Sequence, residues 1–203
     1  YSIRNLIEAN HDQKQYIWTY YPMVDTLSHL HGPDDPRVLA EFQNFSFTFE
    51  QQFLNKLSAE AREGTLLLMS ADHGMIYTGQ QEKFNLVNHP KFTQMLHMNP
   101  TGENRIPYLF VKPGKELSVR NYIAETWPDC FDVYTSAEMI DAGLFGPGEV
   151  YSGLVERVGD LIVVPRGNAY FWWSHKKDPL FGRHGGLHED EMLVPLLALR
   201  LDV

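Results

Sequence analysis

The sequence predicts a mixed α/β fold, and three observations support it. The apolar run from Thr65 to Met69 has the length of a buried strand. From Arg37 to Leu57, large apolar residues recur at spacings of three and four, which is typical of an amphipathic helix. With 203 residues, 43% of them hydrophobic, the chain can bury a sizeable core. We therefore expect one domain, or one domain that carries a subdomain.

Charge and composition exclude two classes of partner. The formal net charge is -9 and the isoelectric point is about 5.4, whereas a protein that neutralises nucleic-acid phosphates needs a basic surface. No apolar run reaches the roughly 18 residues expected of a membrane-spanning helix. We therefore expect no nucleic-acid polymer as partner and no membrane span. The lone Cys130 cannot form a disulfide within the chain, and the sequence leaves the cellular compartment open.

Two strands are predicted in the first third of the chain. Residues Tyr16 to Tyr21 are rich in aromatic and β-branched types and stop at Pro22, which indicates a strand that ends shortly before Asp25. The second strand is the apolar run that ends before Asp72. Because a helix lies between them, we expect a right-handed crossover and parallel strands. Asp25 and Asp72 would then share one edge of a sheet.

The helix between these strands has its own start signals. Pro36 suits the first helical turn, and Asp34 or Asp35 suits the capping position before it. The helix is expected to pack on the sheet through one apolar face. The residues of that face are Leu39, Phe42, Phe45, Phe49, Phe53 and Leu57.

Shorter elements are predicted from about residue 85 to residue 178. They are strands at 108–111, 131–134 and 161–164 and a helix at 116–125. We interpret residues 85–178 as an α+β cap subdomain inserted in a core formed by residues 1–84 and 179–203. The closing run from Met192 to Leu199 indicates a last strand, irregular or at a sheet edge because Pro195 has no backbone N–H.

Two pairs of metal-ligand residues lie near the predicted strand ends. Asp72 and His73 directly follow the apolar strand, so their side chains are expected in the crevice past its carboxyl end. Asp25 and His29 stand four residues apart, which places them on one face if that segment enters a helical turn. Asp oxygen and His nitrogen both bind zinc and other first-row divalent ions. Taken alone, an Asp–His pair at this spacing is more often a surface pair or a helix cap.

A third motif carries His184, within Gly182-Arg183-His184-Gly185-Gly186. Glycines on both sides let the backbone approach a buried centre closely and leave the imidazole unobstructed. The same residues also suit a plain glycine-rich turn. His188, four residues later, is the second choice for the late ligand.

Together the three motifs resemble a known family. Asp-x-x-x-His followed by Gly-Pro, a strand ending in Asp-His-Gly-Met, and a late Gly-x-His-Gly-Gly before Val-Pro-Leu resemble the type I phosphodiesterase and nucleotide pyrophosphatase family of the alkaline phosphatase superfamily. The resemblance runs from Tyr16 to Leu199. It implies an alkaline-phosphatase-like α/β sheet with flanking helices, here without its first strands, plus the inserted α+β subdomain.

The resemblance also implies a site for two divalent metal ions, usually zinc. One ion would be bound by Asp25, His29 and His184. The other would be bound by Asp72 and His73, completed by an aspartate and by a threonine or serine nucleophile that the family carries near the start of its catalytic domain.

The chain departs from the family pattern at that nucleophile. No strand-end aspartate and no nucleophile motif precede Asp25, and Thr26 and Ser28 are poor substitutes because they lie inside the first ligand motif. We therefore expect no catalytic nucleophile in this chain, and place it upstream of Tyr1. The chain is then the C-terminal part of the enzyme, and its partner is the missing N-terminal part.

The activity implied is metal-dependent hydrolysis of phosphoric esters, through a phospho-threonine or phospho-serine intermediate. The expected substrate is a small phosphodiester or nucleotide, and the isolated chain is expected to be inactive. Because imidazole binds metal only when neutral, activity of the complete enzyme should fall at acid pH. Two alternatives remain: a non-catalytic metal-binding or regulatory module, and a sulfatase or phosphomutase of the same superfamily.

Overall fold

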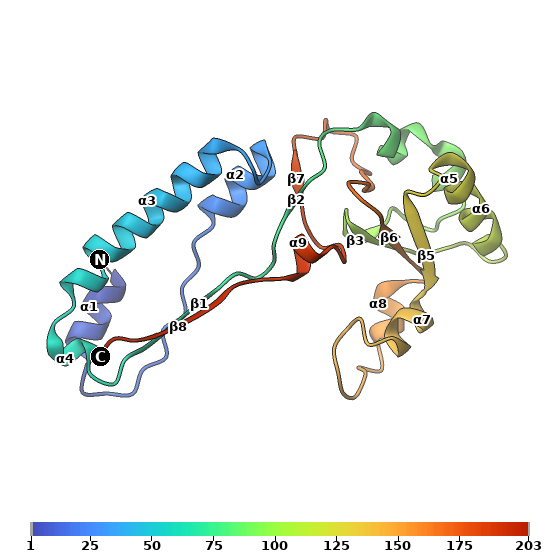
Figure 1. Cartoon of the computed structure of the whole chain (residues 1–203). Coiled ribbons are helices and arrows are strands. Elements are labelled where there is room, and N and C mark those ends of the chain that lie inside the picture. The colour runs from blue at the N-terminus through green and yellow to red at the C-terminus, as the bar shows by residue number, and fades with distance from the viewer. Residues whose placement is uncertain (1, 203) are drawn as a thin grey trace. The chain divides into compact units, whose positions relative to one another are not determined.

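A computed structural model describes residues 2–202, which form two compact units (Figure 1). Unit 1 takes the residues up to Asp72 and those from Val194 onward, and unit 2 takes His73 to Leu193. The boundary therefore falls inside the predicted Asp-His-Gly motif. The division into a core of residues 1–84 and 179–203 and a cap of residues 85–178 stays a prediction.

Unit 1 is mainly helical. Its longest helix, α3 (Pro36–Gln52), begins as predicted: Pro36 takes the first position, and the Asp35 side chain caps the helix by accepting the Arg37 backbone N–H at 3.0 Å. None of the helices that the structure describes has the length and apolar character needed to cross a bilayer. The other helical elements of this unit are α1 (Ser2–Ala9), α2 (Met23–His31), η1 (Leu54–Lys56) and α4 (Ala59–Arg62).

The predicted strand at Tyr16 to Tyr21 is wrong. This segment has no ladder partner among the described residues, and Tyr16 and Trp18 are 90% and 73% exposed. The predicted parallel crossover from it is wrong for the same reason. Aromatic and β-branched composition favours a strand only where a neighbouring backbone accepts the pairing. Asp25 lies inside α2 instead, beyond the helix start at Met23.

The strand predicted after Thr65 is present as β1 (Leu66–Ser70), but the expectation that it is buried is wrong, because Leu66 and Leu68 are 59% and 60% exposed. It pairs antiparallel with β8 (Leu196–Arg200), with Leu66 opposite Arg200 and Ser70 opposite Leu196 (Figure 1). The last strand begins one residue after Pro195, because proline has no N–H to donate to a ladder. Two segments about 130 residues apart in sequence thus form the one ladder described in unit 1.

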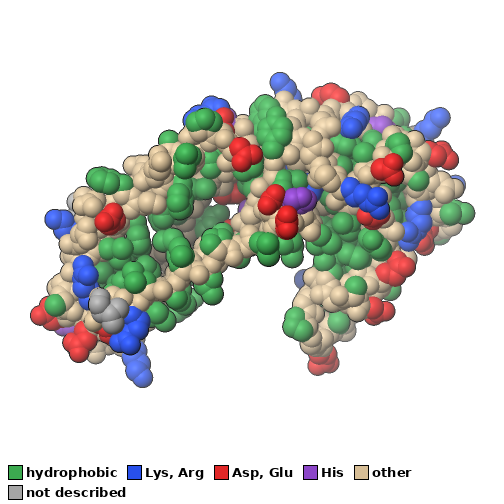
Figure 2. Space-filling view, viewed as in Figure 1, with side chains coloured by type: hydrophobic (Ala, Val, Ile, Leu, Met, Phe, Trp, Pro, Cys, Tyr) green, Lys and Arg blue, Asp and Glu red, His purple; other side chains and the backbone are tan. Residues whose placement is uncertain are grey.

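Unit 1 has a small core and an exposed apolar ladder. Its buried hydrophobic cluster consists of Leu57, Ala61 and Leu201. Hydrophobic side chains lie open along the ladder surface (Figure 2), and two strands alone are marginally stable in water. Unit 1 therefore depends on the helices packed at that cluster. The leucines exposed by 46% to 73% are Leu66, Leu68, Leu196, Leu197 and Leu199.

Unit 2 contains a four-stranded antiparallel sheet in the order β3–β4–β6–β5, of which Figure 1 labels β3, β5 and β6. Three of its elements confirm sequence predictions: β5 (Phe131–Thr135), β6 (Leu161–Pro165) and the helix α6 (Glu116–Thr126). The first two strands are β3 (Thr101–Glu103) and β4 (Ile106–Leu109).

One strand of this sheet is displaced from its predicted position. Strand β4 ends at Leu109, whereas the sequence predicts a strand through Val111. The Val111 backbone N–H instead donates to the Asp160 carboxylate at 2.7 Å, so this N–H does not donate to a neighbouring strand. This hydrogen bond, between residues 49 apart in sequence, takes the place of a further ladder bond at Val111.

Both faces of the sheet are covered, as the alternation along its central strand shows. Leu161 and Val163 of β6 point into a cluster that contains Val119 and Ile123 of α6. Ile162, between them, packs in a second cluster with residues of two short helices, α7 (Ser136–Asp141) and α8 (Leu154–Val158). Strand side chains alternate between faces, so β6 is buried on both.

A second, smaller ladder joins two parts of unit 2 that are distant in sequence. Strand β2 (Ile76–Tyr77) pairs antiparallel with β7 (Gly182–Arg183), with Ile76 opposite Arg183. This pairing brings the segments just before β2 and just after β7 to one place. The remaining elements of unit 2 are η2 (Glu82–Phe84), η3 (Leu86–Asn88), α5 (Pro90–Thr93) and α9 (Glu189–Met192).

Arg183 of β7 is the centre of a buried polar network. Its guanidinium bonds the Asp178 carboxylate and the Thr78 hydroxyl, donates to the Gly79 carbonyl at 3.1 Å, and lies 3.6 Å from the centre of the Tyr170 ring. The Arg183 and Asp178 side chains are 2% and 12% exposed. Burial lowers the pKa of Arg183 and Asp178 opposes that shift, so the two charges depend on each other.

Replacing Asp178 by asparagine should therefore destabilise the protein by about 3 kcal/mol, because a buried arginine loses its counter-charge. Urea unfolding measures the change. The matched control is Asp132→Asn, which breaks the exposed ion pair with Arg166 and should have little effect. Equal effects of the two substitutions would contradict the assignment of Asp178 as an essential counter-charge.

Candidate metal centre

Asp25 and His29 lie one turn apart on α2 in unit 1. The helix puts them on the same face, as their spacing predicts, and His29 Nε2 is 3.4 Å from Asp25 Oδ1. The Asp25 Oδ1 atom is buried and has no hydrogen-bond donor among the described residues. A divalent cation could bind both this buried carboxylate oxygen and the neighbouring imidazole nitrogen, so the pair fits a metal.

Two hydroxyl residues on the same helix take no part in this pair. Ser28 is buried, and its hydroxyl donates to the Val24 carbonyl at 2.7 Å. Thr26 is exposed. The helix ends at Gly32, whose φ of 95° lies in the left-handed region that favours glycine, and whose N–H donates to the Ser28 carbonyl at 2.8 Å.

Asp72 lies just past β1 in unit 1, and its side chain is exposed. Desolvation raises the pKa of the Tyr20 hydroxyl, and the negative charges of Asp72 and Asp25 raise that pKa further. Both carboxylates therefore act on one phenol oxygen.

His73 and His184 lie together in unit 2. Their rings stack with centroids 3.5 Å apart and planes 14° apart, because His184 follows β7 directly and His73 precedes β2 in the paired ladder. The His73 Nδ1 atom is 2.9 Å from the Gly74 carbonyl. A carbonyl only accepts, so Nδ1 carries the proton and Nε2 has the lone pair with which imidazole binds a metal.

The glycines of both histidine motifs permit close backbone contact. At Gly74, a Cβ atom would lie 2.0 Å from the Asp190 carbonyl oxygen. At Gly186 it would lie 2.8 Å from the Glu191 carboxylate, and Gly185 combines a φ of +96° with a Cβ position 2.7 Å from Glu103. Glycine is thus required on the C-terminal side of His184 by close contacts with Glu103 and Glu191, and the predicted approach to a buried metal centre stays a prediction.

His188, the second choice for the late ligand, has a structural role at α9. It caps the helix, since its Nδ1 accepts the Asp190 backbone N–H at 3.2 Å, and its side chain is 43% exposed. The structure thus brings Asp25 and His29 together on α2 in unit 1 and His73 and His184 together in unit 2, and it places Asp72 just past β1. Their joint binding of metal ions stays a prediction.

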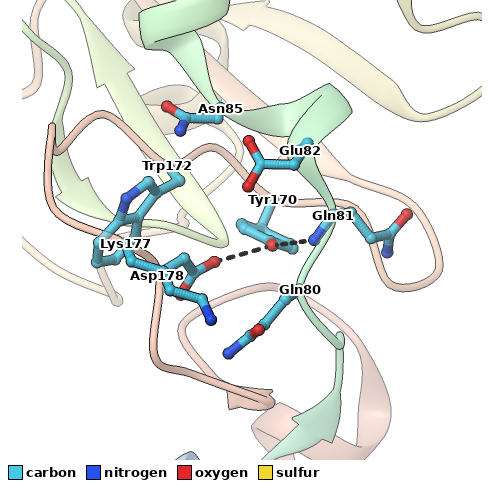
Figure 3. Close-up of a pocket in the computed structure, with 8 residues that line it drawn as sticks. All are labelled: Gln80, Gln81, Glu82, Asn85, Tyr170, Trp172, Lys177 and Asp178. Atoms are coloured by element: carbon cyan, nitrogen blue, oxygen red, sulfur yellow. Dashed lines mark hydrogen bonds between the residues drawn. The ribbon is translucent and has the colours of Figure 1, made fainter.

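An open pocket lies beside the buried Arg183 network in unit 2 (Figure 3). It contains about 270 Å³ of empty space, part of it open to solvent. The Tyr170 hydroxyl lies at its floor, accepting the Gln81 backbone N–H and donating to the Asp178 carboxylate, both at 2.9 Å. Its lining residues are Gln80, Gln81, Glu82, Asn85, Tyr170, Trp172, Lys177 and Asp178.

Comparison with known proteins adds a family and a fold. The family model for type I phosphodiesterase / nucleotide pyrophosphatase matches residues 2–187. Murine ectonucleotide pyrophosphatase / phosphodiesterase 5 is similar in structure, with a TM-score of 0.70 and 19% identity, over 97% of this chain and 51% of that one. Phosphonoacetate hydrolase from Sinorhizobium meliloti 1021 is similar with a TM-score of 0.55 and 17% identity, over 86% of this chain and 43% of that one.

Two of these structures hold small phosphorus compounds. An inactive variant of the murine protein is in complex with AMP, and the bacterial hydrolase is in complex with phosphonoformate. The chain spans about half the length of these solved relatives. No curated protein gives a significant sequence match.

The fold class follows from the structural similarity: it is mixed α/β, of the alkaline-phosphatase-like kind, which confirms the prediction from sequence. The match over residues 2–187 covers nearly the whole chain. The chain belongs to the type I phosphodiesterase / nucleotide pyrophosphatase family.

The Tyr170 hydroxyl gives the stability of this protein a specific dependence on alkaline pH. Burial raises the pKa of Tyr170 to about 12, whereas a tyrosine in the unfolded state has a pKa of about 10. Between about pH 10 and 12 the unfolded state therefore loses this proton first, and the free energy of unfolding falls as pH rises. Urea unfolding at several pH values should show a shallower fall for Tyr170→Phe, and identical slopes would contradict the assignment.

Proposed function

We propose that this chain is part of a metal-dependent phosphoric ester hydrolase of the phosphodiesterase and nucleotide pyrophosphatase type. The observation that carries the proposal is the Asp25–His29 pair on α2, with its buried carboxylate oxygen that lacks a hydrogen-bond donor among the described residues. Family membership over residues 2–187 supports it. The AMP bound by the murine relative supports a small phosphorylated substrate.

The proposed ligand sets follow from the three motifs. The first set binds one divalent ion and consists of Asp25, His29 and His184. Asp72 and His73 contribute to the second ion. Zinc is the proposed metal, because carboxylate oxygen and imidazole nitrogen are both among its usual protein ligands.

When bound, such ions neutralise charge on the transferring phosphoryl group and lower the pKa of an attacking hydroxyl. The contribution of this chain is to hold and orient. Asp25 and Asp72 supply negative charge, and the His73 tautomer is fixed by the Gly74 carbonyl. We propose that the threonine or serine that forms the phosphorylated intermediate lies outside residues 1–203.

Metal content tests the ligand assignment. Asp25→Ala, Asp72→Ala and His184→Ala should each lower the zinc bound per molecule of purified protein, measured by inductively coupled plasma mass spectrometry, because each removes one ligand. His175→Ala, which removes an exposed histidine outside the three motifs, should leave the zinc content unchanged. Retention of full zinc content by all three ligand variants would overturn the proposed centre.

Substrate preference tests the reaction class. The full-length protein should hydrolyse a nitrophenyl phosphate diester faster than the corresponding monoester or sulfate ester, and residues 1–203 alone should show no turnover with added zinc. Activity on the sulfate ester alone would favour a sulfatase. Zinc binding by the full-length protein without turnover of any ester would favour the non-catalytic module.

A further inference from the structure

Both histidine loops of unit 2 are attached to a single residue of α9, Glu191. Its side chain forms a fully buried ion pair with Arg105, and both side chains have an exposure of 0%. We propose that the Arg105–Glu191 pair is a positioning device that holds the His73 and His184 imidazoles together. This inference rests on the proposed function in one respect: the purpose of the arrangement is metal binding.

The carboxylate of Glu191 holds the loop that follows His184. Its Oε1 atom accepts the Gly186 backbone N–H at 2.9 Å and the Arg105 Nε–H at 3.0 Å, and its Oε2 atom accepts Arg105 Nη2 at 2.6 Å. Gly186 is two residues past His184. Because Arg105 and Gly186 engage both carboxylate oxygens, Glu191 acts as a support for the loop, whereas the ligand roles fall to the histidines.

The backbone of the same residue holds the loop that contains His73. The Glu191 carbonyl accepts the Gly74 N–H at 2.8 Å, and Gly74 directly follows His73. Contact is close enough that a Cβ on Gly74 would lie 2.0 Å from the Asp190 carbonyl oxygen. One residue therefore fixes one loop through its side chain and the other through its main chain.

Arg105 is itself anchored from three directions. Besides the two bonds to Glu191, its Nη1 atom donates to the Gly167 carbonyl at 2.9 Å and to the Ala169 carbonyl. Arg105 stands in the turn between β3 and β4 of the four-stranded sheet. Arg105 thereby ties Glu191 to the four-stranded sheet of unit 2.

A purely stabilising role would not need charges at this place. Replacing a buried ion pair by apolar residues of similar volume is often neutral or stabilising. Only hydrogen-bonding groups, however, can hold the Gly186 N–H in a fixed direction, and ligand geometry must be held to within roughly 0.5 Å for tight metal binding. The pair therefore acts on the geometry of the two rings, which stack at 3.5 Å.

The test separates stability from positioning by a double substitution, Arg105→Met with Glu191→Leu, in the full-length protein. No buried charge is left unpaired, although the Gly186 N–H and the Gly167 and Ala169 carbonyls lose these partners, so the loss of stability should be smaller than after removal of one charge alone. A second variant, Glu191→Gln, keeps the volume of the side chain but removes its charge. The matched control is Asp132→Leu with Arg166→Met, which replaces an exposed ion pair of the same kind.

Two readouts are compared. In the metal-free protein, the ring-to-ring nuclear Overhauser effect between His73 and His184 should be present in the wild type and the control and lost in the double variant. Co²⁺ affinity, measured by calorimetry, should fall by about 10- to 100-fold in the double variant, the range typical of lost supporting contacts at metal sites. Glu191→Gln should change both readouts less than the double variant, because its amide oxygen can still accept the Gly186 N–H.

The outcomes are distinct for the two proposals. A folded double variant that keeps the ring-to-ring effect and wild-type Co²⁺ affinity overturns the positioning role. A wild-type protein that shows the ring-to-ring effect and loses it in the double variant, yet binds no Co²⁺, supports positioning and overturns the proposed metal-dependent function.

Discussion

Two charged side chains, Arg105 and Glu191, are removed entirely from solvent in unit 2, and the loops around them satisfy their hydrogen bonds. Taking these charges out of water is costly, and only good geometry with further donors and acceptors offsets that cost. The backbone at Gly167, Ala169 and Gly186 is therefore constrained to present its polar groups to the pair. The glycine motif around His184 owes its conformation to this constraint as much as to its own turn chemistry.

Local pattern predicted two of the longer helices and several strands, whereas other elements depend on pairing partners that are distant in sequence. Helix α3 has its cap and its apolar spacing within one stretch of sequence, and β6 has an apolar run that is buried on both faces. Both were predictable because the signal is local. The segment Tyr16 to Tyr21 has strand-like composition, but a strand needs a neighbouring backbone, and composition does not reveal which segment supplies it.

The candidate site shows the same difference between features with a local sequence signal and features that depend on distant segments. The Asp25–His29 pair follows from helical spacing, so the sequence could indicate it. The stacking of His73 on His184 depends on the β2–β7 ladder, which joins segments about 100 residues apart. The role of Glu191 had no sequence signal, because charged residues are expected at the surface and no motif marks this one for burial.

The ladder of β1 and β8 has a consequence for how the protein is made. Its two strands are separated in sequence by all of unit 2, so a ribosome must synthesise about 130 further residues after β1 before its partner strand exists. Unit 2 can complete its own sheet earlier, while β1 still lacks its partner strand and its leucines stay exposed. Nascent chains with an exposed apolar strand are prone to aggregate, and chaperone demand during translation should therefore centre on β1.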